Sequence, residues 1–87
     1  MYHVELDEWA FSDLDRLTLS EAEEVYEALT LLSHDPRPEG IEIIPTPEAA
    51  GGRAYDYQTN RLNIYYHIFE AEQVIMVFGI FKKISPN

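Results

Sequence analysis

The sequence contains no cysteine and few basic residues, and each shortage excludes a class of protein. Without cysteine there is neither a disulfide nor a thiolate metal site, and a reducing cytoplasm is permitted. No apolar run approaches the roughly 20 residues of a membrane-spanning helix, and the acidic start lacks the basic and apolar segments of a signal peptide. We therefore expect a cytoplasmic protein that does not associate with a membrane.

The 6 basic residues are outnumbered by 16 acidic ones, which gives a formal net charge of −10. The segment 1–30 carries most of this excess, whereas the segment 61–87 is slightly basic. Sequence-independent affinity for nucleic acid comes largely from Lys and Arg side chains that neutralise phosphates. The acidic balance therefore disfavours an ordinary nucleic-acid binder, although acids also simply keep a small protein soluble.

Two apolar runs near the C-terminus, Leu62 to Phe69 and Val74 to Phe81, form the predicted core. Their β-branched and aromatic residues favour strands, and the four polar or small residues between them suit a hairpin loop. The second run has no polar side chain, so we expect it to be buried on both faces, in the middle of a sheet with helices against it. A chain of 87 residues is expected to form a single domain over residues 1–87.

The preceding residues predict two helices and three further strands. In order, these are a strand at 2–6, a helix from 7 to about 18, a helix from 20 to 35, and strands at 41–44 and 53–57. Ser20 and Glu23 have the spacing of a capping box, and Pro36 ends the second helix. The order β-α-α-β-β-β-β predicts an α+β fold in which an N-terminal helical hairpin packs on an antiparallel sheet.

Three local phrases carry a resemblance to a known family. They are EWAFSDLDRL at 8–17, ALTLLSHDPRPEG at 28–40 and RLNIYYHI at 61–68. In this order, over nearly the whole chain, they resemble the RelE/ParE superfamily of type II toxin–antitoxin systems. The resemblance implies that family's fold and a cognate antitoxin that wraps the sheet and covers the groove beside Arg53 to Lys83. It also implies a target, either the ribosome with its mRNA or DNA gyrase.

The positions that matter for catalysis in that family depart from its pattern here. Ribosome-dependent RNases of the family use basic residues to hold mRNA phosphates, because charge develops on the scissile phosphate. Asn63 stands where the family strand usually has Arg, and Asp56 and Gln58 fall near commonly basic positions of the preceding strand. Phe81 falls near a position that is often His. Relative to the family, the catalytic set is eroded.

The side chains that remain for chemistry form two groups. The candidate catalytic residues are Arg61, His67, Lys82 and Lys83, and the candidate binding residues are Arg53, Tyr55, Tyr57 and Tyr66. A histidine can act as a general acid or base near neutral pH, while Arg and Lys hold phosphate. The plainer alternative is that the cations solvate the ends of the sheet and that the tyrosines are packing residues.

Neighbouring tyrosines on one strand divide between two faces. Tyr65 and Tyr66 point in opposite directions if the strand is regular. We expect one of them in the core and the other in an exposed aromatic patch with Tyr55 or Tyr57.

No cofactor or metal is predicted. The spacing of His3, His34 and His67 matches no ligand motif, and there is no glycine-rich phosphate loop.

Two functional hypotheses follow. The leading one is a toxin-like protein that acts by binding the ribosome or gyrase, or by weakened ribosome-dependent mRNA cleavage. The alternative is a non-toxic module on the same fold, without enzymatic activity, that binds another protein or itself as a homodimer. An acidic toxin is further expected to need a partner that is more basic or more apolar than usual.

Overall fold

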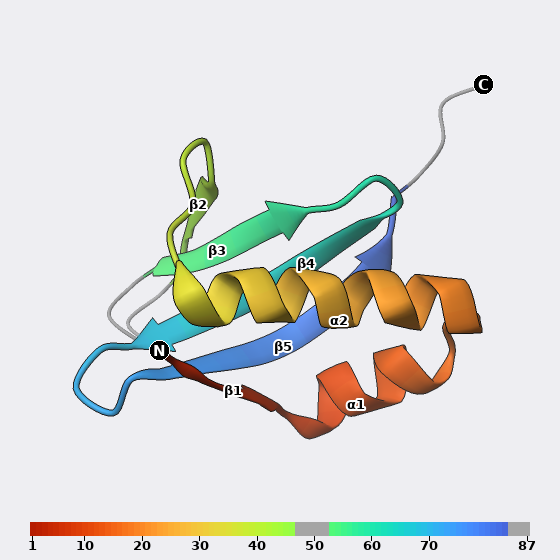
Figure 1. Cartoon of the computed structure of the whole chain (residues 1–87), viewed down its shortest axis with the longest axis horizontal. Helices are drawn as coiled ribbons and strands as arrows, with labels where there is room; N and C mark the ends of the chain where they lie inside the picture. Colours follow the sequence, from red (N-terminus) through yellow and green to blue (C-terminus); the bar gives the residue numbers. More distant parts are fainter. Residues whose placement is uncertain (47–52, 84–87) are drawn as a thin grey trace.

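The computed structural model describes residues 1–46 and 53–83 of the chain. Its elements are β1 (His3–Leu6), α1 (Glu8–Asp15), α2 (Leu19–His34), β2 (Glu42–Pro45), β3 (Arg53–Gln58), β4 (Leu62–Phe69) and β5 (Val74–Lys82). The strands form a five-stranded sheet in the order β1-β5-β4-β3-β2, and α2 crosses it diagonally (Figure 1). α1 packs against β5 and β1. The α+β class is confirmed. Neither helix in the described ranges is long and apolar enough to cross a bilayer.

The sheet is mixed rather than antiparallel. β1 runs parallel to β5, with Val4 beside Ile75 and Leu6 beside Val77. The other three strand pairs are antiparallel. The expected antiparallel sheet was therefore wrong for its first strand. Alternation of apolar residues indicates which face of a strand is buried, but it carries no information about the direction of the neighbouring strand.

The core lies between the sheet and the two helices. Side chains alternate between the faces of a strand, and along β4 those of Leu62, Ile64, Tyr66 and Ile68 are buried on the helix side. α2 covers them with a buried stripe that includes Val25 and Leu32, and α1 adds Ala10. Each fully buried aliphatic side chain of this kind contributes about 1.5–3 kcal/mol. This core fixes the orientation of every strand.

The other side of the sheet, here called the open face, is covered by neither helix. From the strand registers it consists of His3, Glu5, Glu42, Ile44, Ala54, Asp56, Gln58, Asn63, Tyr65, His67, Phe69, Val74, Met76, Phe78, Gly79 and Phe81. β5 therefore alternates between buried and half-buried side chains and is not buried on both faces as expected. An uninterrupted apolar run cannot distinguish a helix-covered face from an exposed apolar one. The open face is where apolar residues meet solvent.

The helices begin and end close to their predicted positions, with one change of cap. α2 begins after Thr18, whose hydroxyl accepts from the Glu21 backbone N–H at 3.2 Å while Glu21 Oε1 accepts from the Thr18 N–H at 2.9 Å. The capping box is thus Thr18 with Glu21, not Ser20 with Glu23. Leu17, which packs against the core, fixes the chain at this earlier entry.

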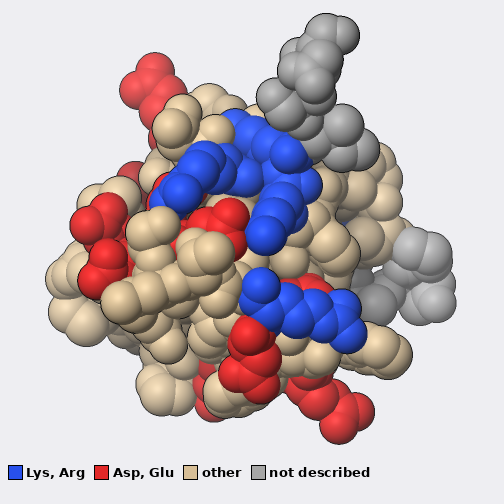
Figure 2. Space-filling model, turned by 90° about the vertical axis from the view of Figure 1, so that its right-hand side faces the viewer, with Lys and Arg blue, Asp and Glu red and all other residues tan. Residues whose placement is uncertain are grey.

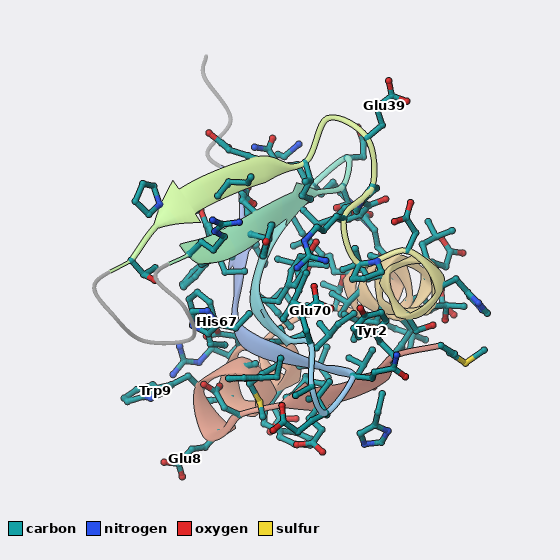
Figure 3. All side chains as sticks on the ribbon, turned by 90° about the vertical axis from the view of Figure 1, so that its left-hand side faces the viewer. Tyr2, Glu8, Trp9, Glu39, His67 and Glu70 are labelled. Carbon is teal, nitrogen blue, oxygen red and sulfur yellow. The ribbon has the colours of Figure 1, made fainter. Side chains whose placement is uncertain are left out.

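The start of the chain is tied to two distant segments. The Tyr2 hydroxyl donates to Glu70 in the β4–β5 turn at 2.5 Å, and Arg37 forms an ion pair with the same carboxylate. Figure 3 shows Tyr2 and Glu70 on the same end of the molecule. The bond from Tyr2, followed by that from Arg37, holds the pKa of Glu70 below its usual value. This contact joins the chain before β1, the α2–β2 connection and the β4–β5 turn.

Candidate functional site

The candidate catalytic residues lie in two separate places. Arg61, Lys82 and Lys83 gather where β4 begins and β5 ends. His67 lies five residues further along β4 than Leu62, roughly 17 Å at the usual rise of a strand. Lys82 pairs with Leu62 on the helix side of the sheet, whereas His67 is on the open face. The four residues therefore do not converge on one site.

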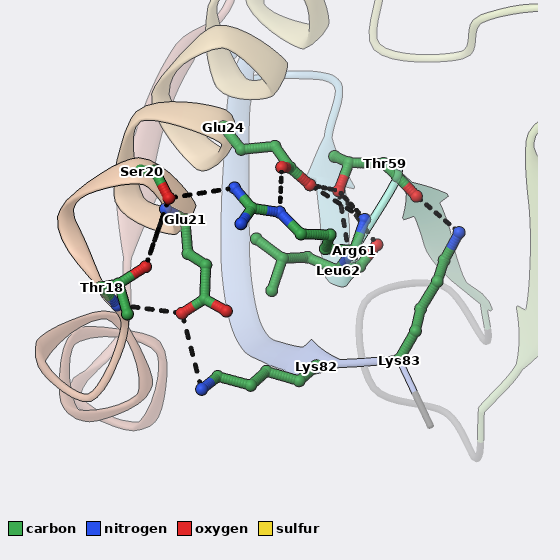
Figure 4. Close-up of polar contacts among 9 residues, drawn as sticks. All are labelled: Thr18, Ser20, Glu21, Glu24, Thr59, Arg61, Leu62, Lys82 and Lys83. Atoms are coloured by element: carbon green, nitrogen blue, oxygen red, sulfur yellow. Dashed lines mark hydrogen bonds and ion pairs between the residues drawn. The ribbon is translucent and has the colours of Figure 1, made fainter. Parts of the chain in front are cut away.

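Arg61 is held by α2 (Figure 4). Its Nε donates to Glu24 Oε1 at 2.9 Å, and its backbone N–H donates to Glu24 Oε2 at 3.0 Å. Its guanidinium also lies 3.3 Å from the Ser20 hydroxyl. The Thr59 hydroxyl donates to the same Glu24 carboxylate, and this bond, together with those from Arg61, holds the pKa of Glu24 below its usual value. These bonds favour the ionised form of Glu24, the anionic partner of Arg61.

The two lysines are also engaged. Lys82 Nζ lies 3.5 Å from Glu21 Oε1, and Lys83 Nζ donates to the Thr59 carbonyl oxygen. The pKa of Glu21 is lowered first by the hydrogen bond from the Thr18 backbone and further by Lys82. Figure 2 shows the Lys and Arg side chains of this end gathered together with Asp and Glu side chains between and beside them.

This basic cluster, defined as Arg61, Lys82 and Lys83, offers a phosphate much less than three isolated cations would. Exposed ion pairs contribute only about 0–1 kcal/mol each, so an incoming anion could displace them. The carboxylates of Glu24 and Glu21, which contact Arg61 and Lys82, would nevertheless repel it. Two of the three positive charges of the cluster are thus balanced by carboxylates of α2.

His67 belongs to an aromatic group on the open face. Its Nδ1 lies 3.1 Å from the Arg53 carbonyl oxygen, and because a carbonyl only accepts, Nδ1 is the donor. Its ring stacks on Phe78 with centroids 4.6 Å apart. Tyr65 continues the group, edge-on to Phe81 at 5.5 Å and tilted against Phe78 at 6.1 Å. The Arg53 side chain itself is exposed, and only the backbone of that residue reaches His67.

The tyrosines proposed as binding residues are mostly core residues. Tyr55 and Tyr66 are 2% and 0% exposed, and their rings stack 5.5 Å apart on the helix side. The Tyr66 hydroxyl donates to the Pro36 carbonyl at 2.7 Å, and burial raises its pKa. Tyr57 is half-buried on the same side. The expected place of Tyr55 or Tyr57 in an exposed patch was therefore wrong, because β3 pairs in the register that turns both inward. The expected division of Tyr65 and Tyr66 between two faces is confirmed, with Tyr66 in the core.

The exposed patch is formed instead by Tyr65, Phe78 and Phe81, none of which was among the predicted site residues. Phe78 is an extra residue at a register shift between Tyr65 and Tyr66. At Gly79, an added Cβ would lie 2.7 Å from the Phe81 ring, so glycine leaves room for that ring. These residues line an apolar hollow of about 400 Å³ with Ile44, Thr46 and Ala54, here called the aromatic hollow.

A polar group lies beside this hollow, at the positions where the resemblance led us to look for cations. Asp56 is only 5% exposed. Asn63 Nδ2 donates to its two carboxylate oxygens at 3.2 and 3.0 Å. Gln58 Nε2 lies 3.3 Å from Asp56 and 3.4 Å from Glu42. The centre of the open face is thus acidic and amide-rich rather than basic.

The described residues contain no group of three or more His, Asp and Glu side chains placed to hold a metal ion. What the arrangement can do chemically is limited by its geometry. One end offers partly neutralised cations, and the open face offers aromatic surface and an anionic centre. Both are properties of a binding surface.

The fold is similar to that of proteins of known structure. No family model matches the sequence, and no curated protein matches it. Among solved structures, the isolated E. coli RelE toxin has a TM-score of 0.82 and 18% sequence identity, with 99% of this chain and 88% of that chain covered. A chain of the intact E. coli RelBE toxin–antitoxin complex has a TM-score of 0.80 and 18% identity, covering 98% and 100%.

An archaeal protein gives the same result. A chain of the RelE–RelB complex of Pyrococcus horikoshii has a TM-score of 0.76 and 14% identity, covering 93% of both chains. The molecule is therefore a small α+β protein with two helices on a five-stranded mixed sheet. More particularly, its fold is that of the RelE toxins, as the local phrases of the sequence had indicated.

Proposed function

We propose that this chain is the toxin-like component of a toxin–antitoxin pair and that it acts by binding its target rather than by efficient cleavage of mRNA. The fold supports the first half, because this chain is similar over almost its whole length to RelE proteins, several of them solved with antitoxins. The second half is carried by one observation, the pairing of Arg61 with Glu24 and of Lys82 with Glu21.

Cleavage of a phosphodiester needs positive charge and a proton-transfer group at one point. Here the basic cluster is partly neutralised, and His67 lies on the other face of the sheet and some distance along β4. Asp56 adds a carboxylate to the centre of the open face, where it would disfavour a phosphate backbone. Binding to a gyrase or ribosomal surface requires none of this chemistry. Weakened cleavage through Lys83 and His67 is the second mode that the assay below distinguishes.

The partner implied by this proposal is a cognate antitoxin, and both members of such a pair work in the cytoplasm. The antitoxin's role is to cover the surface that the toxin needs. That places the antitoxin and the target in competition for overlapping parts of this chain.

The test is inducible expression of the chain in a bacterial host, with growth followed while protein synthesis and DNA synthesis are labelled separately. Arrest in which DNA synthesis falls first supports a gyrase-directed mode, and arrest in which protein synthesis falls without mRNA cleavage supports ribosome binding. Protein synthesis that falls together with cut mRNA supports weakened cleavage. Normal growth in the presence of abundant, folded protein contradicts the proposal.

A non-toxic interaction module is the alternative favoured by one specific feature. Trp9 and Phe11 on α1 are 73% and 58% exposed, and Figure 3 shows Trp9 extending outward from the helix. Large exposed aromatic side chains are common at protein interfaces. Normal growth combined with a stable protein complex or homodimer would select this alternative.

A further inference from the structure

The aromatic hollow is an apolar concavity on the open face. Ile44 and Ala54 oppose each other across β2 and β3, and Tyr65 is flanked by the rings of Phe78 and Phe81. Phe81 is 52% exposed. Concave apolar surface bordered by polar side chains marks sites where another molecule docks.

The neighbouring acidic pair has no cation of its own. Glu42 and Asp56 are directly opposite each other in the register of β2 and β3. Their hydrogen-bond donors are the neutral amides of Gln58 and Asn63. Every Lys and Arg of the chain lies in the described ranges, and none forms an ion pair with Glu42 or Asp56. Like charges opposite each other on adjacent strands repel, so a cation from outside would stabilise both.

The two features have a fixed spacing. Ile44 follows Glu42 by two residues on β2, and Ala54 precedes Asp56 by two residues on β3. At the usual rise of a strand, the acidic pair is about 7 Å from the floor of the hollow. In an extended peptide, side chains at positions i and i+2 lie on one face with the same separation.

Other charges around this surface do not change its sign. Lys82 and Lys83 border a separate hollow, which is also lined by Gln58, Asn63, Tyr65 and Phe81. Lys82 forms an ion pair with Glu21, and the ammonium group of Lys83 donates to the Thr59 carbonyl. On the opposite side, Glu39 lines an acidic hollow of about 570 Å³ together with Glu42 and Asp56. The carboxylate of Glu39 therefore lines the same hollow as the acidic pair, whereas neither lysine does.

We propose that the open face docks an extended segment of a partner protein, which places an aliphatic or aromatic side chain in the aromatic hollow and an Arg or Lys against the exposed Glu42, beside the largely buried Asp56. The identification of this partner as the antitoxin rests on the proposed function, whereas the chemistry of the segment follows from the surface itself. A nucleic acid is disfavoured as the occupant because its phosphates would meet this acidic pair.

The experiment uses the purified full chain as bait for a displayed library of random twelve-residue peptides. Selected peptides are expected to carry Arg or Lys two positions from an aliphatic or aromatic residue. Their amide-shift perturbations in nitrogen-labelled protein are expected on the open face of β2, β3 and β4. Asp56→Asn and Phe81→Ser are each expected to weaken binding about tenfold or more.

The control is Glu23→Gln, which removes the same charge from an exposed position of α2 and is expected to leave binding unchanged. If Asp56→Asn does not fold, Glu42→Gln at the exposed member of the pair replaces it. The proposal is overturned by peptides without a basic residue, by equal binding to Asp56→Asn, or by a selection that yields nothing. Tight binding of a single-stranded RNA decamer to the open face, or self-association that buries Phe81, also overturns it. None of these results bears on the growth assay, which tests the proposed function separately.

Discussion

Arg61 is bound to Glu24 twice, once through its backbone N–H at 3.0 Å and once through Nε at 2.9 Å. One carboxylate on α2 thereby fixes both the turn between β3 and β4 and the guanidinium that follows from it. Bonds to a charged acceptor are stronger than those between neutral groups. Arg61, which the sequence suggested as a phosphate ligand, therefore connects α2 to the β3–β4 turn within the fold.

Glu24→Gln is expected to lower the free energy of unfolding by about 1–2 kcal/mol, because it removes a charge that three hydrogen bonds from Thr59 and Arg61 stabilise. Urea unfolding followed by circular dichroism measures the change. Glu27→Gln, on an exposed position one turn later, is the matched control and should shift the midpoint little. Equal effects from the two substitutions would show that net charge, and not this contact, determines stability.

Stability should fall in acid. The pKa values of Glu21, Glu24 and Glu70 are lowered in the folded chain, so the folded state binds fewer protons than the unfolded state around the ordinary carboxyl pKa. The resulting stabilisation is present above that pKa of 4.5 and is lost as the pH falls through the lower folded values. Urea midpoints at a series of pH values below neutrality should show this decline. The decline should be shallower in Glu24→Gln, and an unchanged slope would contradict the assignment.

The adjacent residues Tyr66 and Tyr65 differ in burial: the Tyr66 side chain is fully buried in the core, and the Tyr65 side chain is half-buried on the open face. Tyr66→Ala is expected to cost about 3–5 kcal/mol because it opens a cavity in the core and removes the bond to Pro36. Tyr65→Ala removes a half-buried ring from the open face and is expected to cost less than half as much. Denaturant unfolding of both variants checks the prediction. A larger loss from Tyr65→Ala would mean that the open face contributes more to stability than its exposure indicates.

The double variant Glu21→Gln/Glu24→Gln should bind a single-stranded RNA decamer more tightly than the parent chain, by about tenfold at low salt, since it releases Arg61 and Lys82 from their carboxylates. Fluorescence anisotropy of the labelled RNA, repeated at increasing salt, gives the affinity and the number of phosphates contacted. Glu23→Gln/Glu27→Gln changes the net charge equally at exposed positions. If both double variants gain the same affinity for the RNA, net charge rather than the ion pairs limits RNA binding in the parent chain.

Much of the fold could be predicted because its signals are local. The runs Leu62 to Phe69 and Val74 to Phe81 are β4 and most of β5, and helix-breaking prolines follow α2 as expected. What failed depends on relations between distant residues. The parallel pairing of β1 with β5 and the inward turn of Tyr55 follow from register, which no single segment contains.

The candidate site was less predictable for the same reason. Arg61 and Glu24 are 37 positions apart, and neither residue type indicates the other as its partner. The aromatic hollow depends on a register shift opposite Tyr65 and Tyr66, beyond which Phe81 lies on the same open face as Phe78. The acidic centre at Asp56 was visible as a departure from a family pattern, but its hydrogen bonds to Asn63 and Gln58 required the sheet to be assembled.

The position of β1 beside β5 has a consequence for the nascent chain. Among the strands that the structure describes, β1 comes first in the sequence, yet it pairs with β5, which comes last. The Ile80 backbone N–H likewise donates to Asp13, 67 positions earlier. This contact between α1 and β5 also cannot form until β5 has been synthesised. Pairings of such long sequence separation form late and slowly. While the polypeptide is still being translated, the RelE-like architecture therefore cannot close, and its complete surface is first presented after β5 has emerged from the ribosome.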